Sequence, residues 1–152
     1  MGNKARLESP VGSLTLTERD GGIAALDWGR FGGEAETDVL REAVAELEAY
    51  FSGALQNFSV PLKPKGSAFQ QKFYNSLCAI PYGETRTYGE LAAELDVSAQ
   101  AIGQGCGANP LAILIPCHRV LGATSLGGYS GRQGIETKVA LLKLEGAAGL
   151  LI

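Results

Sequence analysis

Residues 109–120 read NPLAILIPCHRV, an apolar run that ends at a proline followed by a cysteine and a histidine. Five consecutive apolar residues, 111–115, predict a buried strand. Pro116 offers no N–H to a ladder and restricts Ile115 to extended backbone, so the chain should turn there. We therefore expect Cys117 at the end of the strand, inside a cleft.

Cys117 stands next to His118, the only histidine of the chain. A thiolate is a nucleophile, a free thiol has a pKa of about 8.5, and an imidazole beside it can take its proton. An imidazole that acts as a base is usually oriented by a carboxylate, and Glu145 and Glu84 are the candidates. The pair is equally compatible with an inert buried cysteine beside a hydrogen-bonded histidine. As a reactive pair it fits a hydrolase, a thiol oxidoreductase or a group acceptor, although no C-x-x-C motif supports the redox interpretation.

The composition is that of a globular protein without a metal site or a membrane segment. The 152 residues suffice for one large domain or two small lobes, and 45% of them are hydrophobic and 19% charged. Apolar runs are far shorter than the roughly 18 residues of a membrane span, and the N-terminus lacks a signal-peptide core, so we expect a cytoplasmic protein. One histidine and three cysteines (Cys78, Cys106 and Cys117) cannot form a zinc site of the usual spacing, so we expect no metal.

Charge divides the chain in two at a proline-rich segment. Residues 1–60 carry 5 basic and 10 acidic side chains, whereas residues 61–152 carry 8 basic and 6 acidic ones. Any polyanion should therefore meet the second part. Two prolines and a glycine in 61–67 disfavour helix and strand and predict a linker. We expect an N-terminal lobe over 1–62 and a C-terminal domain over 67–152.

The N-terminal lobe shows the pattern of a small antiparallel meander followed by a helix. Short β-prone segments lie between turn residues, at 4–8, 13–18 and 23–28. Thr37 can cap a helix that stops at Gly53. The apolar stripe of this helix consists of Leu40, Val44, Leu47 and Phe51. Residues 56–60 are a candidate for one more strand.

The C-terminal domain is predicted to be mainly helical. Capping boxes at Ser67 and Thr87 mark two helix starts. A tight turn after the second helix and a third helix from Ala99 complete the outline of a helix-turn-helix, which DNA-binding proteins share with ordinary helical hairpins. After a polar, glycine-rich loop over 122–134, a last helix starts at Ile135.

Several motifs of this domain occur together in one protein family. They are Pro116-Cys117-His118-Arg119-Val120 with Asn109-Pro110 before it, Ile80-Pro81-Tyr82-Gly83-Glu84-Thr85, and Tyr88-Gly89-Glu90-Leu91-Ala92. On these residues the chain resembles the methylated-DNA–protein-cysteine methyltransferase family, from Phe69 to Gly146. The first lobe is similar in layout to the family's ribonuclease-H-like lobe. The resemblance implies an α+β fold, with an antiparallel sheet and a helix in the first lobe and a winged helix-turn-helix-like second domain.

The resemblance implies a DNA-repair reaction with a double-stranded DNA partner. Proteins of this family flip an O6-alkylguanine out of the duplex, because the alkyl carbon cannot be reached in the base stack. They transfer the alkyl group irreversibly to their own cysteine, which here would be Cys117, with His118 as its base through a water and Glu145 orienting His118. O4-alkylthymine is a second candidate substrate. Each molecule is then expected to act once, as a monomer and without a cofactor.

The resemblance also assigns the other residues of the site. Tyr88 is expected to donate a proton to guanine N3 with the help of Lys138, and Asn109 to hold the turn before the nucleophile through its side chain. Each of the three also fits a role outside catalysis: Tyr88 as a core tyrosine, Lys138 as a solvated charge and Asn109 as a helix stop. The expected pocket residues are Tyr129 and Ser130. The expected DNA-binding residues, with the helix from Ala99 entering the minor groove, are Thr87, Ala99, Gln100, Ala101, Gly103 and Arg119.

Gln100 occupies the position of the arginine that, in this family, fills the gap left by the flipped base. Glutamine can enter the stack but brings no charge to the phosphate-lined groove, so we expect weaker DNA binding and slower repair of duplex lesions. A protein that binds alkylguanine without repairing it, like relatives that lack the cysteine, is the alternative function, and a cysteine hydrolase is a more remote one. The presence of Cys117 favours the repair enzyme.

Overall fold

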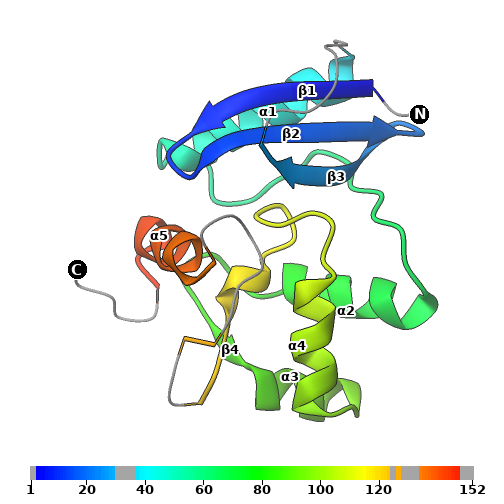
Figure 1. Cartoon of the computed structure of the whole chain (residues 1–152), viewed down its shortest axis with the longest axis vertical. Coiled ribbons are helices and arrows are strands. Elements are labelled where there is room, and N and C mark those ends of the chain that lie inside the picture. Colours follow the sequence, from blue (N-terminus) through cyan, green and yellow to red (C-terminus); the bar gives the residue numbers. More distant parts are fainter. Residues whose placement is uncertain (1–2, 30–36, 124–125, 128–133, 148–152) are drawn as a thin grey trace. The chain divides into compact units, whose positions relative to one another are not determined.

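The computed structural model of the chain divides into two compact units, residues 1–65 and residues 66–152 (Figure 1). The residues that the structure describes are 3–29, 37–123, 126–127 and 134–147. The first unit combines a sheet with one helix and the second is mainly helical, which confirms the predicted α+β class. Within the described ranges, no helix is long and apolar enough to cross a membrane.

The N-terminal unit is built on an antiparallel sheet with the strand order β1-β2-β3. Its strands, which confirm the predicted meander, are β1 (Asn3–Ser9), β2 (Gly12–Arg19) and β3 (Gly22–Trp28). Asp20 and Gly21 both have positive φ, 54° and 80°, and form the two-residue turn that suits the twist of a hairpin. Leu14 lies between Leu7 of β1 and Trp28 of β3, so one face of the sheet is apolar.

Helix α1 (Asp38–Phe51) contacts all three strands. Thr37 caps it as predicted, because its hydroxyl accepts a hydrogen bond of 3.2 Å from the Leu40 N–H. The buried residues of the helix are spaced three or four apart and are Leu40, Ala43, Leu47 and Tyr50. The expected stripe members Val44 and Phe51 are half-buried at its edge.

The further strand predicted over 56–60 is wrong. The N–H groups of Ser59 and Val60 donate to the Glu46 carboxylate of α1, at 3.0 and 3.1 Å. Pairing with the sheet occurs only afterwards, where Leu62 forms a parallel bridge with Ile23. A helix side chain therefore takes the backbone donors that a strand would use, and a β-prone composition carries no signal for such a partner.

The C-terminal unit consists of short helices and a small parallel sheet. Its elements are α2 (Ala68–Cys78), β4 (Arg86–Thr87), α3 (Tyr88–Leu95), α4 (Ala99–Gly107), the 3-10 helix η1 (Cys117–Arg119), β5 (Val120–Leu121) and α5 (Ile135–Glu145). Both predicted capping boxes are present, at Ser67 and Thr87. Asp96, with a φ of 57°, ends α3, and Ser98 caps α4. The predicted helix pair of a helix-turn-helix is therefore confirmed.

The strand predicted over 111–115 is wrong, although all five side chains are buried. The Leu114 N–H donates to the Ala112 carbonyl at 2.9 Å, and Ile113 between them has a φ of 74°. This is a γ-turn, and a positive φ is a genuine outlier for a β-branched residue. The apolar run thus signalled burial correctly, but it is buried as a tight turn and does not join either sheet of the described chain.

A second tight turn surrounds Pro116, as its position in the sequence predicts. Pro116 has φ −81° and ψ 65°, and the Cys117 N–H donates across it to the Ile115 carbonyl at 2.8 Å. These values are those of an inverse γ-turn. Cys117 therefore follows a turn, and not the end of a strand.

Candidate active site

Cys117 opens η1 and is buried, with 5% of its surface exposed. Burial raises the pKa of its thiol, because a thiolate loses hydration in the interior. A hydrogen bond from the Asn109 side chain and the positive charge of Lys138 act in the opposite direction. The thiol is therefore protonated at rest, beside groups that stabilise the thiolate once the proton has left.

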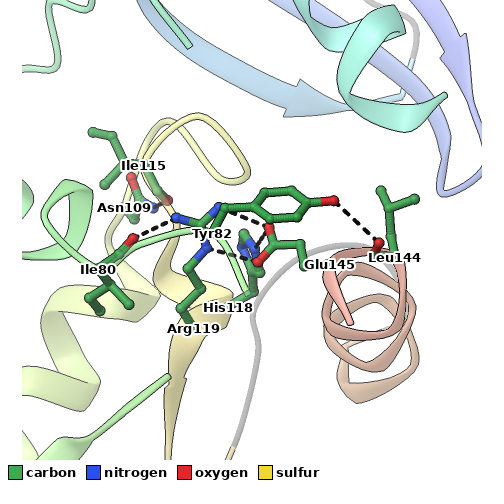
Figure 2. A network of polar contacts seen from close by, with 8 residues as sticks. All are labelled: Ile80, Tyr82, Asn109, Ile115, His118, Arg119, Leu144 and Glu145. Atoms are coloured by element: carbon green, nitrogen blue, oxygen red, sulfur yellow. Dashed lines mark hydrogen bonds and ion pairs between the residues drawn. The ribbon is translucent and has the colours of Figure 1, made fainter. Parts of the chain in front are cut away.

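Asn109 connects the end of α4 to the turn before Cys117. Its Nδ2 donates to the Ile115 carbonyl at 2.9 Å (Figure 2), and its Oδ1 accepts from the Leu111 N–H at 2.9 Å. Its own N–H donates to the Cys106 carbonyl in the last turn of α4, at 3.2 Å. One side chain therefore ties the helix to the backbone that positions the thiol.

His118 and Glu145 form a buried pair. The His118 Nε2 atom lies 2.7 Å from the Glu145 Oε2 atom, and neither side chain has exposed surface. A carboxylate only accepts hydrogen bonds, so Nε2 carries the proton and Nδ1 of the neutral ring presents a lone pair. Nδ1 is buried, and none of the described residues bonds to it. Burial lowers the pKa of His118 against the opposing effect of Glu145, so the ring is neutral at pH 7.

Lys138 of α5 is completely buried and reaches Tyr88 at the start of α3. Its Nζ donates to the Val120 carbonyl at 2.6 Å, and it lies 3.5 Å from the Tyr88 hydroxyl and 5.6 Å from the centre of the ring. Burial lowers the pKa of Lys138, whereas the thiols of Cys106 and Cys117 raise it. An ammonium group in this position stabilises negative charge on the phenol oxygen.

Comparison with protein families accounts for nearly the whole chain. Residues 4–64 match the ribonuclease-like domain of 6-O-methylguanine DNA methyltransferase, and residues 68–147 match its DNA-binding domain. The chain belongs to the 6-O-methylguanine DNA methyltransferase family. The resemblance seen in the sequence motifs is thereby confirmed.

Individual relatives from the 6-O-methylguanine DNA methyltransferase family align with this chain over almost their full lengths. The methylated-DNA–protein-cysteine methyltransferase of Methanosarcina acetivorans is 41% identical, with 94% of this chain and 97% of the relative covered. That of Mycobacterium leprae is 40% identical, with 91% and 89% covered. The crystal structure of Mycobacterium tuberculosis OGT in complex with DNA aligns with a TM-score of 0.85 and 41% identity, covering 95% of this chain and 92% of that one.

In this methyltransferase, the position of Arg119 differs from the one expected from the sequence. Its surface is only 6% exposed, and its Nε and Nη2 donate to the Glu145 carboxylate at 2.8 and 3.0 Å. Its Nη1 donates to the Ile80 carbonyl at 2.7 Å (Figure 2). The expectation that Arg119 contacts DNA is therefore wrong. The physical reason is that a carboxylate buried in the domain needs a counter-charge there.

The other expected DNA-binding residues lie on or next to the helix pair. On α4, the exposed members are Ala99 and Gln100 and the half-buried members are Ala101 and Gly103. Thr87 is half-buried and caps α3 with its hydroxyl. The expected pocket residues of the methyltransferase site, Tyr129 and Ser130, lie outside the described residues.

The structure adds two residues that the sequence analysis did not single out for the site. The Tyr82 ring lies 5.8 Å from the Arg119 guanidinium carbon, and the Tyr82 hydroxyl donates to the Leu144 carbonyl at 3.3 Å. Gly127 approaches Tyr88 so closely that a Cβ atom on it would lie 2.7 Å from the hydroxyl. Tyr82 had a signal in its motif, whereas nothing distinguished Gly127 from the other glycines of its loop.

The two carboxylates considered for His118 differ in burial and in contacts, in agreement with the role that the resemblance gave to Glu145. Glu84 is exposed, whereas Glu145 is buried against the imidazole. No group of three or more histidine, cysteine, aspartate or glutamate side chains gathers as a metal site in the ranges that the structure describes.

Proposed function

We propose that this methyltransferase repairs O6-alkylguanine in double-stranded DNA by transferring the alkyl group to Cys117, once per molecule. The observation that carries the proposal is a buried Cys117 next to a neutral His118 whose far nitrogen lies 2.7 Å from Glu145. Family membership supports the reaction class, and the relative in complex with DNA supports a DNA partner. O4-alkylthymine is a second candidate substrate.

Alkyl transfer begins with removal of the Cys117 proton. The Nδ1 atom of His118 accepts this proton through a water, and Glu145 stabilises the resulting imidazolium through Nε2. The thiolate attacks the alkyl carbon in line with its bond to O6. A carbon–sulfur bond forms while the electron pair of the broken carbon–oxygen bond moves onto the guanine. Because the thioether product has no good leaving group, the transfer is not reversed.

The departing guanine gains negative charge that must be neutralised. In the proposal, the Tyr88 hydroxyl donates a proton to guanine N3, and Lys138 at 3.5 Å stabilises the phenolate that forms. The proton first taken from Cys117 later returns to Tyr88, so the reaction neither consumes nor releases a proton. On the family resemblance, the proposal assigns Tyr129 and Ser130 to the alkylguanine pocket and the Ser130 backbone N–H to O6 as a hydrogen-bond donor.

Helix α4 makes the DNA contacts from the minor groove in this proposal. A Cβ atom at Gly103 would meet nothing within 4 Å, so this position lets a backbone come close. Gln100 enters the gap left by the flipped base, and Thr87, Ala99 and Ala101 supply further contacts. Residues 67–152 then form the DNA-binding and alkyl-accepting domain, and residues 1–62 form the ribonuclease-like lobe.

The proposed reaction also bears on the cellular compartment and the oligomeric state of the protein. We assign the protein to the cytoplasm as a monomer, because one copy carries every group named above and Cys117 must stay reduced to react. The three cysteines are free thiols in the structure. One equivalent of lesion should consume one molecule of protein.

Intact-mass measurement after incubation with an O6-methylguanine duplex tests the proposal. We expect one methyl increment, mapped by peptide analysis to Cys117, and no increment with unmodified DNA. Cys117→Ala should abolish it, and Cys78→Ala, at an exposed cysteine of α2, should keep it. Lesion-selective binding without an increment would instead make this chain a lesion-binding protein, and the absence of both would overturn the DNA-repair assignment.

A further inference from the structure

Arg119 and His118 share one carboxylate. The Arg119 Nε atom donates to Glu145 Oε1 at 2.8 Å and its Nη2 donates to Oε2 at 3.0 Å. His118 Nε2 lies 2.7 Å from the same Oε2. Dashed lines mark these contacts in Figure 2. This two-pronged contact of a guanidinium with a carboxylate is among the strongest ion-pair geometries in proteins.

The segment before β4 holds the guanidinium from another part of the domain. The Ile80 carbonyl accepts from Arg119 Nη1 at 2.7 Å, and the Tyr82 ring lies 5.8 Å from the guanidinium carbon. The Tyr82 hydroxyl donates to the carbonyl of Leu144, the residue before Glu145, at 3.3 Å. Arg119 and the last turn of α5 are therefore held by the same short segment.

The charges of this cluster decide the protonation state of the imidazole. The charged groups that act on His118 are Glu145 and Lys138 on α5 and Arg119 on η1, and Tyr82 faces Glu145 from the segment before β4. Arg119 and Glu145 neutralise each other, so a proton on His118 would leave an uncompensated positive charge in the interior. Without Arg119, the buried carboxylate would lack a counter-charge, and a proton on His118 would supply one.

We propose that Arg119 is a positioning residue for alkyl transfer, which keeps His118 a neutral proton acceptor by pairing with Glu145. The Ile80 carbonyl and Tyr82 hold it in place for this task. The inference rests on the proposed function, since it affects the reaction only if His118 takes the Cys117 proton. In this arrangement Nδ1 keeps its lone pair at neutral pH, and the base is ready before DNA binds.

Substitutions at Arg119 separate its charge from its hydrogen-bond geometry. Arg119→Met removes the charge with a side chain that still fills much of the space. Arg119→Lys keeps the charge but cannot make the two-pronged contact. Arg41→Met, which breaks an exposed ion pair with Asp38 in α1, is the matched control.

The single histidine of the chain makes the test direct. Nitrogen-15 NMR of the imidazole during a pH titration reports which ring nitrogen carries a proton and where the ring becomes charged. We expect a neutral, Nε2-protonated ring at pH 7 in the wild type, in Arg119→Lys and in Arg41→Met. In Arg119→Met, the titration midpoint should rise by about one pH unit or more, a roughly tenfold change in the ratio of charged to neutral ring.

Two NMR results would overturn the proposal. One is a folded Arg119→Met protein with the wild-type midpoint. The other is a charged imidazole at pH 7 in the wild type, which decides the matter even if Arg119→Met does not fold.

Single-turnover transfer from O6-methylguanine DNA gives the second readout. The transfer rate of Arg119→Met should be lower at pH 6.5 than at pH 8.5, in proportion to the charged fraction of the ring that the NMR titration gives and by about tenfold if the midpoint reaches 7.5, whereas the wild-type rate should change little. A merely structural role would lower the rate equally at both pH values and would also contradict the proposal. If the wild type transfers no alkyl group at all, the proposed function fails, and the NMR titration still decides what Arg119 does to His118.

Discussion

The side-chain amide of Asn109 donates a 2.9 Å hydrogen bond to the carbonyl of Ile115, two residues before Cys117. The same carbonyl oxygen accepts a hydrogen bond from the Cys117 N–H at 2.8 Å. Asn109 therefore fixes the carbonyl that in turn holds the backbone of Cys117. Its Oδ1 accepts the Leu111 N–H at the other end of the apolar run. The run contains Ile113 at a φ of 74°, a costly conformation that persists only where surrounding contacts enforce it.

Replacing Asn109 with alanine should therefore weaken both the fold and the reaction. The N–H of the buried Leu111 would lose its partner, and an unsatisfied buried donor costs about 1–3 kcal/mol. We expect this loss in the free energy of unfolding in urea, and alkyl transfer slower by at least roughly tenfold because the thiol is less well placed. Asn75→Ala, at an exposed position of α2, should change neither quantity. An unchanged transfer rate in Asn109→Ala would contradict the positioning role.

The rate of alkyl transfer should be nearly independent of pH between about 6.5 and 8.5. Burial lowers the pKa of His118 below its ordinary value of 6.5 and raises the pKa of Cys117 above the value of about 8.5 for a free thiol. Inside this window the ring is neutral and the thiol is protonated. The proton moves from the thiol to the ring with no net uptake from or release to bulk solvent, so the rate does not depend on pH. At lower pH, once the ring takes up a proton, the rate should fall. Single-turnover rates across the range provide the check, and a rate that rises tenfold per pH unit inside the window would rule out His118 as the base.

Two glycines of α4 should respond in opposite ways to a methyl group. A Cβ atom at Gly105 would lie 2.6 Å from the buried ring of Phe73, which would have to shift, so Gly105→Ala should cost about 1–3 kcal/mol of unfolding free energy. At Gly103 nothing lies within 4 Å, and Gly103→Ala should stabilise the helix by about 0.5–1 kcal/mol. Urea unfolding measures both effects.

Gly103→Ala also tests the proposed DNA-binding face, because its methyl group would stand in the space through which the duplex approaches. We expect this variant to bind duplex DNA more weakly than the wild type although it is more stable. Equal binding by the two proteins would place the contact surface elsewhere.

Cys106 should remain unmodified while Cys117 is alkylated. Burial raises the pKa of Cys106 to about 12, and the nearby thiol of Cys117 adds to the increase. Its thiolate fraction at pH 8 is then on the order of one in ten thousand. In native protein treated with iodoacetamide, peptide mapping should show Cys106 labelled far more slowly than the exposed Cys78. Equal labelling of the two in urea is the control, and equal labelling in the native state would contradict the prediction.

Replacing Gln100 with arginine should strengthen binding to duplex DNA. Gln100 is exposed on α4, and an added positive charge near the phosphates releases about one more counterion. We expect higher affinity, a salt dependence that is steeper by about one, and faster repair of duplex lesions. Gln104→Arg, one turn further along the exposed side of the same helix, controls for charge alone. Unchanged affinity and rate in Gln100→Arg would show that glutamine serves this position as well as arginine.

Local signals in the sequence were reliable because they involve neighbours along the chain. The helix starts at Thr37, Ser67 and Thr87 depend on a side chain that bonds an N–H three residues on, and all three are present. The strands predicted over 56–60 and 111–115 were wrong for a related reason. An apolar or β-prone run signals burial, whereas a strand also needs a partner, which distant parts of the chain supply.

By itself, the sequence determined the family, the α+β class and the adjacency of Cys117 and His118, since each is written in neighbouring residues or in motifs. The family resemblance named Glu145 as the partner of His118, but only the tertiary structure shows how a carboxylate 27 residues away comes to lie 2.7 Å from the imidazole. It also decided that Arg119, beside the nucleophile in the motif, turns inward to Glu145. The physical reason is that a charge can be buried only with its partner, and packing of separate elements determines which partner is within reach.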